Sequence, residues 1–332
     1  MSDENLDHIA ATYEDLVDLE REFDDVETEI VRQQHALSKP LYEKRQKLVA
    51  KIPNFWPLVM EQAPPDVDQY IQPSDSAVLL SSLQSISVSN FELDSDPKGE
   101  PRSISIKMEF SENEWFEDKV LEKKFWFRHS KDGSAGLVSD PVPIKWKADK
   151  DLTDGLLDLA VKVWKQDQEQ AKANGASKDK KKTNPENWTS EQKALREKID
   201  AFGIGGVSFF CWFGFRGENV TAEESRIAVE KQKKLRADKA AGKAPELKEA
   251  KDEDDEDEDE EEDPYALEIF PDGDDLAVAI SEDVWPSAIK YFTQAQEADA
   301  MSDIDFEDME DEEMGEDDED DDEAPPLKKV KA

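Results

Sequence analysis

The sequence of 332 residues contains a single cysteine, Cys211, and no long apolar run. One thiol cannot form an intrachain disulfide, so the framework typical of small secreted domains is excluded. Residues 1–10 carry Asp and Glu where a signal peptide has a basic and then an apolar stretch. No apolar run approaches the roughly 20 residues that a helix needs to cross a bilayer. We therefore expect an intracellular protein with no membrane partner.

Metal-binding and catalytic signatures are scarce as well. The histidines are His8, His35 and His129. They lack the spacing of a zinc site, and the sequence has no Gly-x-Ser-x-Gly elbow, Walker loop or His-Glu-x-x-His motif. The segment nearest to an EF-hand loop begins at Asp94, but Lys98 and Ser105 stand at two of its ligand positions. We expect no enzyme activity, no bound metal and no cofactor.

Acidic residues, in contrast, are abundant and concentrated towards the C-terminus. From residue 252 to the end there are 36 Asp and Glu against 4 Lys and Arg, a net charge of −32, which leaves −9 of the total −41 for residues 1–251. Residues 252–263 are all acidic. A block this dense repels itself and cannot be buried, so we predict a solvated, disordered tract that binds a strongly basic partner. This charge disfavours nucleic acid and anionic membranes as direct partners and favours cationic proteins such as histones.

Apolar residues recur every seven positions near the N-terminus. They are Ile9, Leu16, Phe23, Ile30 and Leu37, with Leu19 and Val26 three residues after two of them. This spacing predicts a coiled-coil-like seam on a long helix, and such a helix is unstable by itself. Two interpretations are open: the helix packs its seam on its own domain, or it self-associates along the seam, which we favour. Pro40 lies inside the pattern and predicts a kink.

A globular domain is expected from residue 53. Between residues 83 and 127 the apolar pattern has period two and is interrupted by turn-rich segments, which predicts antiparallel strands with one solvated face. Helical spacing follows at 151–164. The aromatic segment 207–215, Val-Ser-Phe-Phe-Cys-Trp-Phe-Gly-Phe, must be buried or docked because such a patch would cause aggregation if exposed.

The second half of the domain alternates charged and apolar segments. A lysine-rich insertion at about 165–200 is predicted to be mobile with some helix near its end, and residues 222–239 form a charged helical arm. A Pro-Asp-Gly turn predicts a hairpin within 265–280. Residues 284–292 predict a short amphipathic helix with Trp285, Ile289 and Phe292 on one side.

The charge changes sign at the C-terminal end, where residues 325–331 read Pro-Pro-Leu-Lys-Lys-Val-Lys. A short cationic peptide on a disordered terminus favours a nuclear localisation signal, bound by an import receptor, over chance lysines. The lysines concerned are Lys328, Lys329 and Lys331.

Five segments resemble, in order, those of the nucleosome assembly protein (NAP) family, with closest likeness to its SET, or template-activating-factor, branch. They are KPLYEKRQKLVAKIPNFW (39–56), EFSENEWFEDKVLEKKFWF (109–127), IKWKADKDLT (144–153), SFFCWF (208–213) and SEDVWPSAIKYF (281–292). The resemblance spans roughly residues 13–292. The lysine-rich insertion and the charged arm depart from the short members of this branch.

The resemblance implies an α+β fold. Residues 1–52 would form the long dimerisation helix, kinked near Pro40, with a seam of Leu16, Leu19, Phe23, Val26, Ile30 and Leu37. Residues 53–292 would form an earmuff domain of antiparallel sheet backed by helices, with the insertion at about 165–200 and the charged arm plus acidic run at about 217–263. Residues 293–332 would be an acidic disordered tail that ends in the basic peptide.

The resemblance further implies a homodimeric histone chaperone that assembles and disassembles nucleosomes without ATP. It would bind core histones, in either of the two kinds of core-histone pair. It would contact nucleic acid only through histones, or weakly through the lysine-rich insertion. It would act in the nucleus and shuttle with the cytoplasm. Two alternatives are a phosphatase inhibitor of the SET type and, less favoured, a low-affinity calcium buffer. The expected histone-binding residues are Glu282 and Asp283 in the fold, and Asp252, Glu253, Asp254, Asp255, Glu256, Asp257, Glu258, Asp259, Glu260, Glu261, Glu262 and Asp263 in the acidic run.

Overall fold

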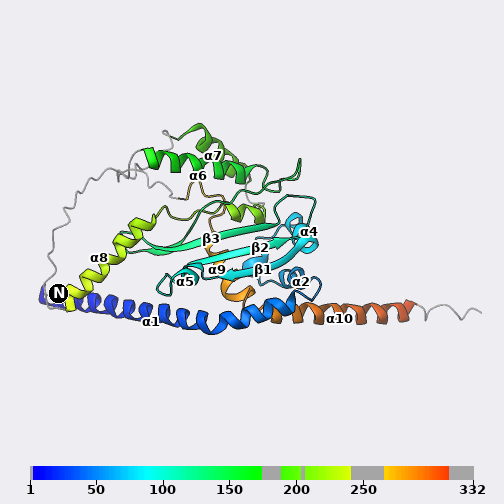
Figure 1. Ribbon diagram of the computed structural model, residues 1–332, viewed down its shortest axis with the longest axis horizontal. Helices are drawn as coiled ribbons and strands as arrows, with labels where there is room; N and C mark the ends of the chain where they lie inside the picture. Colours follow the sequence, from blue (N-terminus) through cyan, green and yellow to red (C-terminus); the bar gives the residue numbers. More distant parts are fainter. Residues whose placement is uncertain (1–2, 174–187, 203–205, 241–264, 314–332) are drawn as a thin grey trace, which may run out of the picture.

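A long N-terminal helix runs along one side of a sheet-based domain in the computed structural model, which describes residues 3–173, 188–202, 206–240 and 265–313 (Figure 1). Helix α1, Asp3–Val49, contains Pro40 and continues as helix on both sides of it. The sheet is antiparallel and carries helices, as in the α+β class predicted from the sequence. The predicted fold class is confirmed.

The sheet of the described residues has four strands joined in sequence order: β1 (Leu83–Ser89), β2 (Ile104–Phe110), β3 (Val120–His129) and β4 (Ala135–Ser139). Every neighbouring pair is antiparallel, and Ile86 stands opposite Met108 in the register. Side chains alternate between faces, so Ile86, Met108 and Phe125 are buried whereas Glu122 and Lys124 are exposed. The period-two prediction is confirmed.

Helices cover the buried face and the ends of the sheet. Those near the first strand are α2 (Phe55–Glu61), α3 (Pro65–Asp68), α4 (Pro73–Ser82) and α5 (Phe91–Ser95). After the sheet come α6 (Leu156–Ala173), α7 (Ser190–Phe202), the 3₁₀ helix η3 (Phe209–Gly214), α8 (Ala222–Ala240), α9 (Gly273–Val278), the π-helix η4 (Ala279–Val284) and α10 (Ala288–Glu313). Helices α6 and α7 pack together on the side of the sheet away from α1 (Figure 1).

The aromatic segment forms the centre of the core. All six residues of η3 are buried, and the ring of Trp212 stacks on Phe125 of β3 with centroids 5.4 Å apart. The indole N–H of Trp212 donates to the carbonyl of Gly273 at 2.8 Å, so this polar group is satisfied inside the core. The prediction that this segment is buried is confirmed.

Two buried carboxylates hold the ends of this segment. Asp75 of α4 accepts hydrogen bonds from the Ser208 hydroxyl at 2.6 Å and the Phe209 N–H at 2.7 Å. Glu268 accepts the backbone N–H groups that follow η3, at 2.9 and 3.2 Å, from Arg216 and Gly217. Burial raises the pKa of both carboxyl groups, and the hydrogen bonds oppose that rise.

Lys123 of β3 holds the same segment from the other side, although its side chain is fully buried. Its ammonium group donates to three backbone carbonyls at 3.1, 3.1 and 2.9 Å, those of Asp140, Phe213 and Phe215. Three acceptors match the three N–H donors of an ammonium. Burial lowers the pKa of Lys123 to about 7, and Glu268 and Asp140 act in the opposite direction.

This lysine predicts a pH-dependent stability. The folded pKa of Lys123 is about 7 and the ordinary value is 10.5, so between these values the unfolded chain binds more protons than the folded chain. The contribution of Lys123 to the free energy of unfolding therefore increases as pH rises from about 7 towards 10.5, and decreases as pH falls over the same range. Urea denaturation across that pH range, in the wild type and in Lys123→Met, isolates the contribution. Parallel pH profiles in the two proteins would contradict it.

The hairpin predicted within residues 265–280 is wrong, because this segment contains α9 and η4. Its buried residues follow helical spacing: Leu276, Ala277, Ile280 and Val284. The glycine of the Pro-Asp-Gly sequence serves close packing instead of a hairpin turn. A Cβ atom on Gly273 would lie 2.3 Å from Cγ of Phe215, so only glycine fits there.

The amphipathic helix predicted at 284–292 has a different buried side from the one expected. Ala288, Tyr291 and Ala295 are buried, whereas Ile289 is 59% exposed. The prediction for Ile289 is therefore wrong. Helix α10 continues past residue 292, the expected end of the domain, to Glu313. The remainder of the acidic tail, 314–332, lies outside the described residues.

Helix α8 is the predicted charged arm, and it connects the sheet to α1 (Figure 1). Near its start, the Ser225 hydroxyl accepts a hydrogen bond from the backbone N–H of His129 at 3.0 Å. Near its end, Arg236 forms an ion pair with Asp25 at 2.7 Å. A search of the described helices finds none with the length and apolar character of a membrane span.

Candidate functional site

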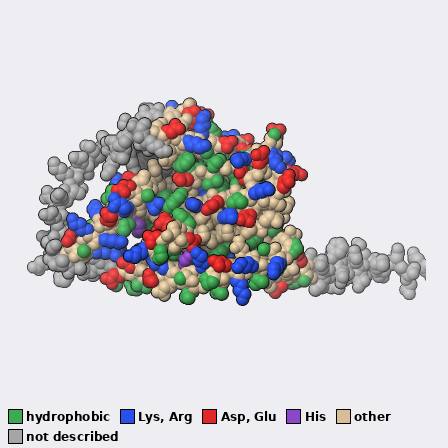
Figure 2. Space-filling view, in the orientation of Figure 1, with side chains coloured by type: hydrophobic (Ala, Val, Ile, Leu, Met, Phe, Trp, Pro, Cys, Tyr) green, Lys and Arg blue, Asp and Glu red, His purple; other side chains and the backbone are tan. Residues whose placement is uncertain are grey.

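The predicted seam lies on the outward side of α1. Its members are exposed by 47% at Leu19 up to 75% at Leu37, and the set is Leu16, Leu19, Phe23, Val26, Ile30 and Leu37. Figure 2 shows hydrophobic side chains along the outer edge of the molecule over α1. Leu41 and Leu48 extend the stripe. A continuous row of large apolar side chains open to water marks an interaction surface.

A different side of α1 faces its own domain. The residues concerned recur every three or four positions and are buried or half-buried: Arg32, His35, Ser38, Tyr42, Arg45 and Val49. The seam therefore does not attach α1 to the domain, and the described part of the chain leaves it uncovered. The interpretation in which the seam packs on its own domain is contradicted.

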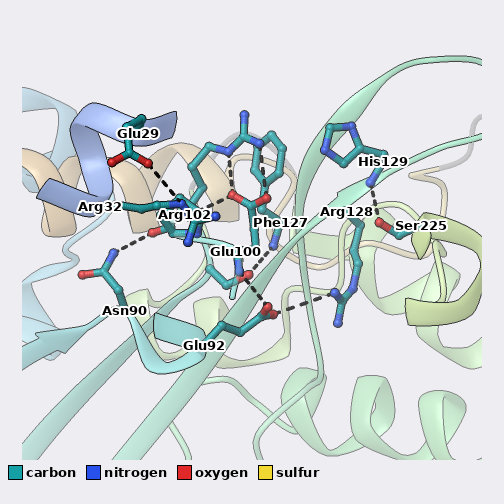
Figure 3. A network of polar contacts seen from close by, with 12 residues as sticks. Glu29, Arg32, Asn90, Glu92, Glu100, Arg102, Phe127, Arg128, His129 and Ser225 are labelled. Carbon is teal, nitrogen blue, oxygen red and sulfur yellow. Dashed lines mark hydrogen bonds and ion pairs between the residues drawn. The ribbon is translucent and has the colours of Figure 1, made fainter. Parts of the chain in front are cut away.

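Polar side chains join the middle of α1 to the segment around α5 (Figure 3). Arg32 donates to the carbonyl of Pro97 at 3.0 Å. His35 Nδ1 lies 2.9 Å from Oδ1 of Asn90. These contacts position α1 beside the first edge of the sheet without covering the seam.

The arginines of this network have partners inside it (Figure 3). Arg102 binds Glu100 at 2.8 Å, and its guanidinium lies 3.8 Å from the centre of the Phe127 ring. Arg128 lies 3.8 Å from Glu92, and burial lowers the pKa of Arg128. Because each of these cations faces a carboxylate, the part of the domain beside α1 is neutralised internally.

The two acidic residues predicted within the fold have different surroundings. Glu282 is exposed and so can meet a cationic partner directly. Asp283 is half-buried and accepts a hydrogen bond from the Tyr291 hydroxyl at 2.9 Å. Burial and this carboxylate raise the pKa of Tyr291 to about 12. Asp283 is thus partly engaged in holding η4 against α10.

Sequence reasoning missed a second acidic surface, around Tyr70. The Tyr70 hydroxyl donates to Asp272 at 3.2 Å, and burial together with the nearby Asp272, Asp275 and Asp66 raises the pKa of Tyr70 to about 12. These residues come from the segment at α3 and the segment at α9, which are about 200 positions apart in the chain. The abundance of Asp near each segment was the only available signal, and it does not indicate proximity.

The described residues contain no group of three or more His, Cys, Asp or Glu side chains arranged to hold a metal ion. Cys211 is buried, and burial raises the pKa of its thiol. The predicted acidic run at 252–263 lies outside the described residues. So do Lys328, Lys329 and Lys331 of the predicted nuclear localisation signal.

Comparison with known proteins finds relatives along nearly the whole chain. A family model described as nucleosome assembly protein (NAP) matches residues 17–295. A putative nucleosome assembly protein of Schizosaccharomyces pombe is 38% identical over 43% of this chain and 60% of the relative. Protein SET of Drosophila melanogaster is 33% identical over 46% of this chain and 55% of the relative. The matches to these two relatives thus span little more than half of each relative's length.

Two further likenesses extend over more of the chain. Vacuolar protein sorting-associated protein 75 of Saccharomyces cerevisiae is 27% identical over 94% of this chain and 86% of the relative. A crystal structure of Vps75 matches with a TM-score of 0.50 and 23% identity, covering 86% of this chain and 99% of that chain. At this identity the structural likeness shows a shared fold.

Proposed function

The chain belongs to the nucleosome assembly protein family, and from this premise we propose that it is a histone chaperone that works as a homodimer without ATP. The observation that carries the proposal is the family match over residues 17–295, which includes the sheet and every seam residue except Leu16. Its cargo is core histones, in either of the two kinds of core-histone pair. Its partners do not include membranes, and it meets nucleic acid mainly through the histones it carries.

The exposed seam supports the dimer. Burying a large apolar side chain contributes about 1.5–3 kcal/mol. The six seam side chains of a single chain are each at least 47% exposed. Pairing α1 with its counterpart in a second copy covers these residues in both chains. The seven-residue recurrence suits helices that wind around each other.

Charge supports the cargo. Histone tails bind DNA by neutralising phosphates and releasing counterions. An acidic tract is a competing polyanion without base edges or a double helix, so it lowers the activity of free histone and still releases it to DNA. The net charge of −32 from residue 252 onward supplies this competitor.

We assign capacity and specificity to different parts. Exposed ion pairs contribute about 0–1 kcal/mol each and are screened by salt, so the tracts bind many cations with little selectivity. Selectivity requires positions fixed in the fold. Asp283 and Asp272 accept hydrogen bonds from the hydroxyls of Tyr291 and Tyr70 and supply such positions, and the exposed Glu282 lies beside Asp283 in η4.

Neutralising the acidic segments at 252–263 and 303–323 is expected to weaken histone shielding by about ten-fold without abolishing it, because counterion release scales with the number of charges. The variant replaces Asp by Asn and Glu by Gln, and the readout is the amount of protein that prevents histones and DNA from precipitating at physiological salt. A control with the native acids in shuffled order should behave as wild type. A variant that shields no histone, or one that shields histones as well as wild type, would contradict this division of roles. Histones indifferent to the wild-type protein would remove the chaperone proposal itself.

Location follows from the cargo. A protein that exchanges histones with DNA acts in the nucleus, and we propose that the basic peptide at 325–331 is the segment an import receptor binds. Shuttling with the cytoplasm would bring newly made histones to chromatin.

A further inference from the structure

Arg45 is a buried cation at the end of α1 that lies beyond the seam. Its residue exposure is 9%, although arginine is seldom buried without strong partners. Burial lowers the pKa of its guanidinium. The energetic cost of removing this charge from water must be offset by contacts, and those contacts identify what Arg45 does.

The partners of Arg45 come from two distant parts of the domain. Nη1 donates to the carbonyls of Trp285 and Pro286 at 2.5 and 3.1 Å, at the junction of η4 and α10. The guanidinium lies over the rings of Trp285 and Tyr42, 4.7 and 4.8 Å from their centres. The centres of the Tyr42 and Trp285 rings are 4.0 Å apart. Trp56 of α2 lies slightly farther away, at 5.9 Å.

The other contacts between α1 and the domain in the described residues include separate polar pairs, such as Arg32 with Pro97 and Arg236 with Asp25. A cavity of about 170 Å³ separates α1 from β1, lined by Tyr42 and Ser38 on one side and Ile86 and Val88 on the other. Other connections are exposed pairs such as Lys39 with Asp94, at 2.5 Å, which water and salt weaken.

We propose that Arg45 is the positioning residue that fixes the angle between the dimerisation helix and the domain. A planar guanidinium that lies over two neighbouring rings and donates to two successive carbonyls allows one orientation of its neighbours. The cavity beside it leaves room for α1 to tilt when that constraint is removed. The inference rests on the proposed dimer in one respect: in a dimer this angle sets the separation of the two domains and so the space available to cargo.

The test measures the angle inside one chain. Spin labels are placed on Cys substituted for Gln34 on α1 and for Lys119 before β3, both exposed in the structure. Cys211 is buried and stays unlabelled. Labelled chains are diluted with unlabelled chains, so that a dimer holds at most one labelled copy. The distance distribution is compared in wild type, Arg45→Met, Arg45→Lys and the adjacent exposed control Lys44→Met.

We expect Arg45→Met to broaden the distribution by about two-fold, as for a hinge released from a rigid contact, while dimer mass by light scattering is unchanged. Lys44→Met should match wild type. Arg45→Lys keeps the charge but loses the planar fork, so an intermediate width is expected. A wild-type width in folded Arg45→Met overturns the proposal. If Arg45→Met fails to fold, Arg45→Lys decides, and a wild-type width there overturns it equally. Both labels lie on one chain and no histone is present. The result of this test is therefore independent of whether the chaperone proposal holds.

Discussion

Replacing Phe23 and Ile30 by aspartate is expected to convert the proposed dimer to a monomer. Both side chains lie on the seam and are 62% and 55% exposed in the single chain, so much of their surface is free to be buried by a second copy. Burial of large apolar side chains contributes about 1.5–3 kcal/mol each, and a symmetric dimer loses each contact twice. Allowing for the part already covered, the loss is roughly 4 kcal/mol or more, which is about a 10³-fold weaker dimer. Aspartates opposed in the seam weaken it further.

Light scattering and sedimentation at several protein concentrations measure this change. Phe23 and Ile30 are more than half exposed, so the near-ultraviolet circular dichroism of the domain should stay as in wild type. A matched control adds the same charge elsewhere on α1, at Gln34 and Gln46, which are exposed and outside the seven-residue recurrence of the seam. That control should remain dimeric. A wild-type protein that is already monomeric at micromolar concentration would sink the dimer proposal.

Replacing Lys123 by methionine is expected to destabilise the domain by about 3–5 kcal/mol, the usual effect of removing one partner from a buried charged network. Methionine fills similar space, so the loss is mainly polar. The three carbonyls at residues 140, 213 and 215 lose their donor inside the core. Glu268 also loses the cation that favours its charged form. These carbonyls flank the end of η3, so the aromatic centre of the core loses an anchor.

The adjacent Lys124 provides the control. Its side chain is on the exposed face of the sheet and is 45% exposed, so Lys124→Met should change stability by about 0.5 kcal/mol or less. Urea denaturation at one fixed protomer concentration measures both variants, because the apparent stability of the proposed dimer would depend on concentration. Equal unfolding midpoints for the two variants would show that the buried lysine does not support the core.

Local pattern and tertiary context contributed differently to the fold. The period-two strands were predictable because side chains on opposite faces of a half-buried sheet must alternate in polarity. The segment 265–280 was not, because the Pro-Asp-Gly signal is shared by hairpin turns and helix starts. What decides there is the ring of Phe215 against Gly273, a contact between distant residues. The exposure of Ile289 was not predictable either: Phe292 of α10 stacks on Phe55 of α2, a contact between distant segments, whereas Ile289 stays exposed.

The amino-acid sequence alone determined the seam on α1, the strand alternation and the separation of a modestly charged domain from its strongly acidic C-terminal part. These features depend on spacing and composition, which act over a few residues. Only the tertiary structure decided that the seam faces outward, that Lys123, Asp75 and Glu268 are buried and paired, and that Arg45 reaches Trp285. The physical reason is that an ionisable group is stable inside a protein only where distant segments bring donors or acceptors to it, and no local pattern records which segments meet.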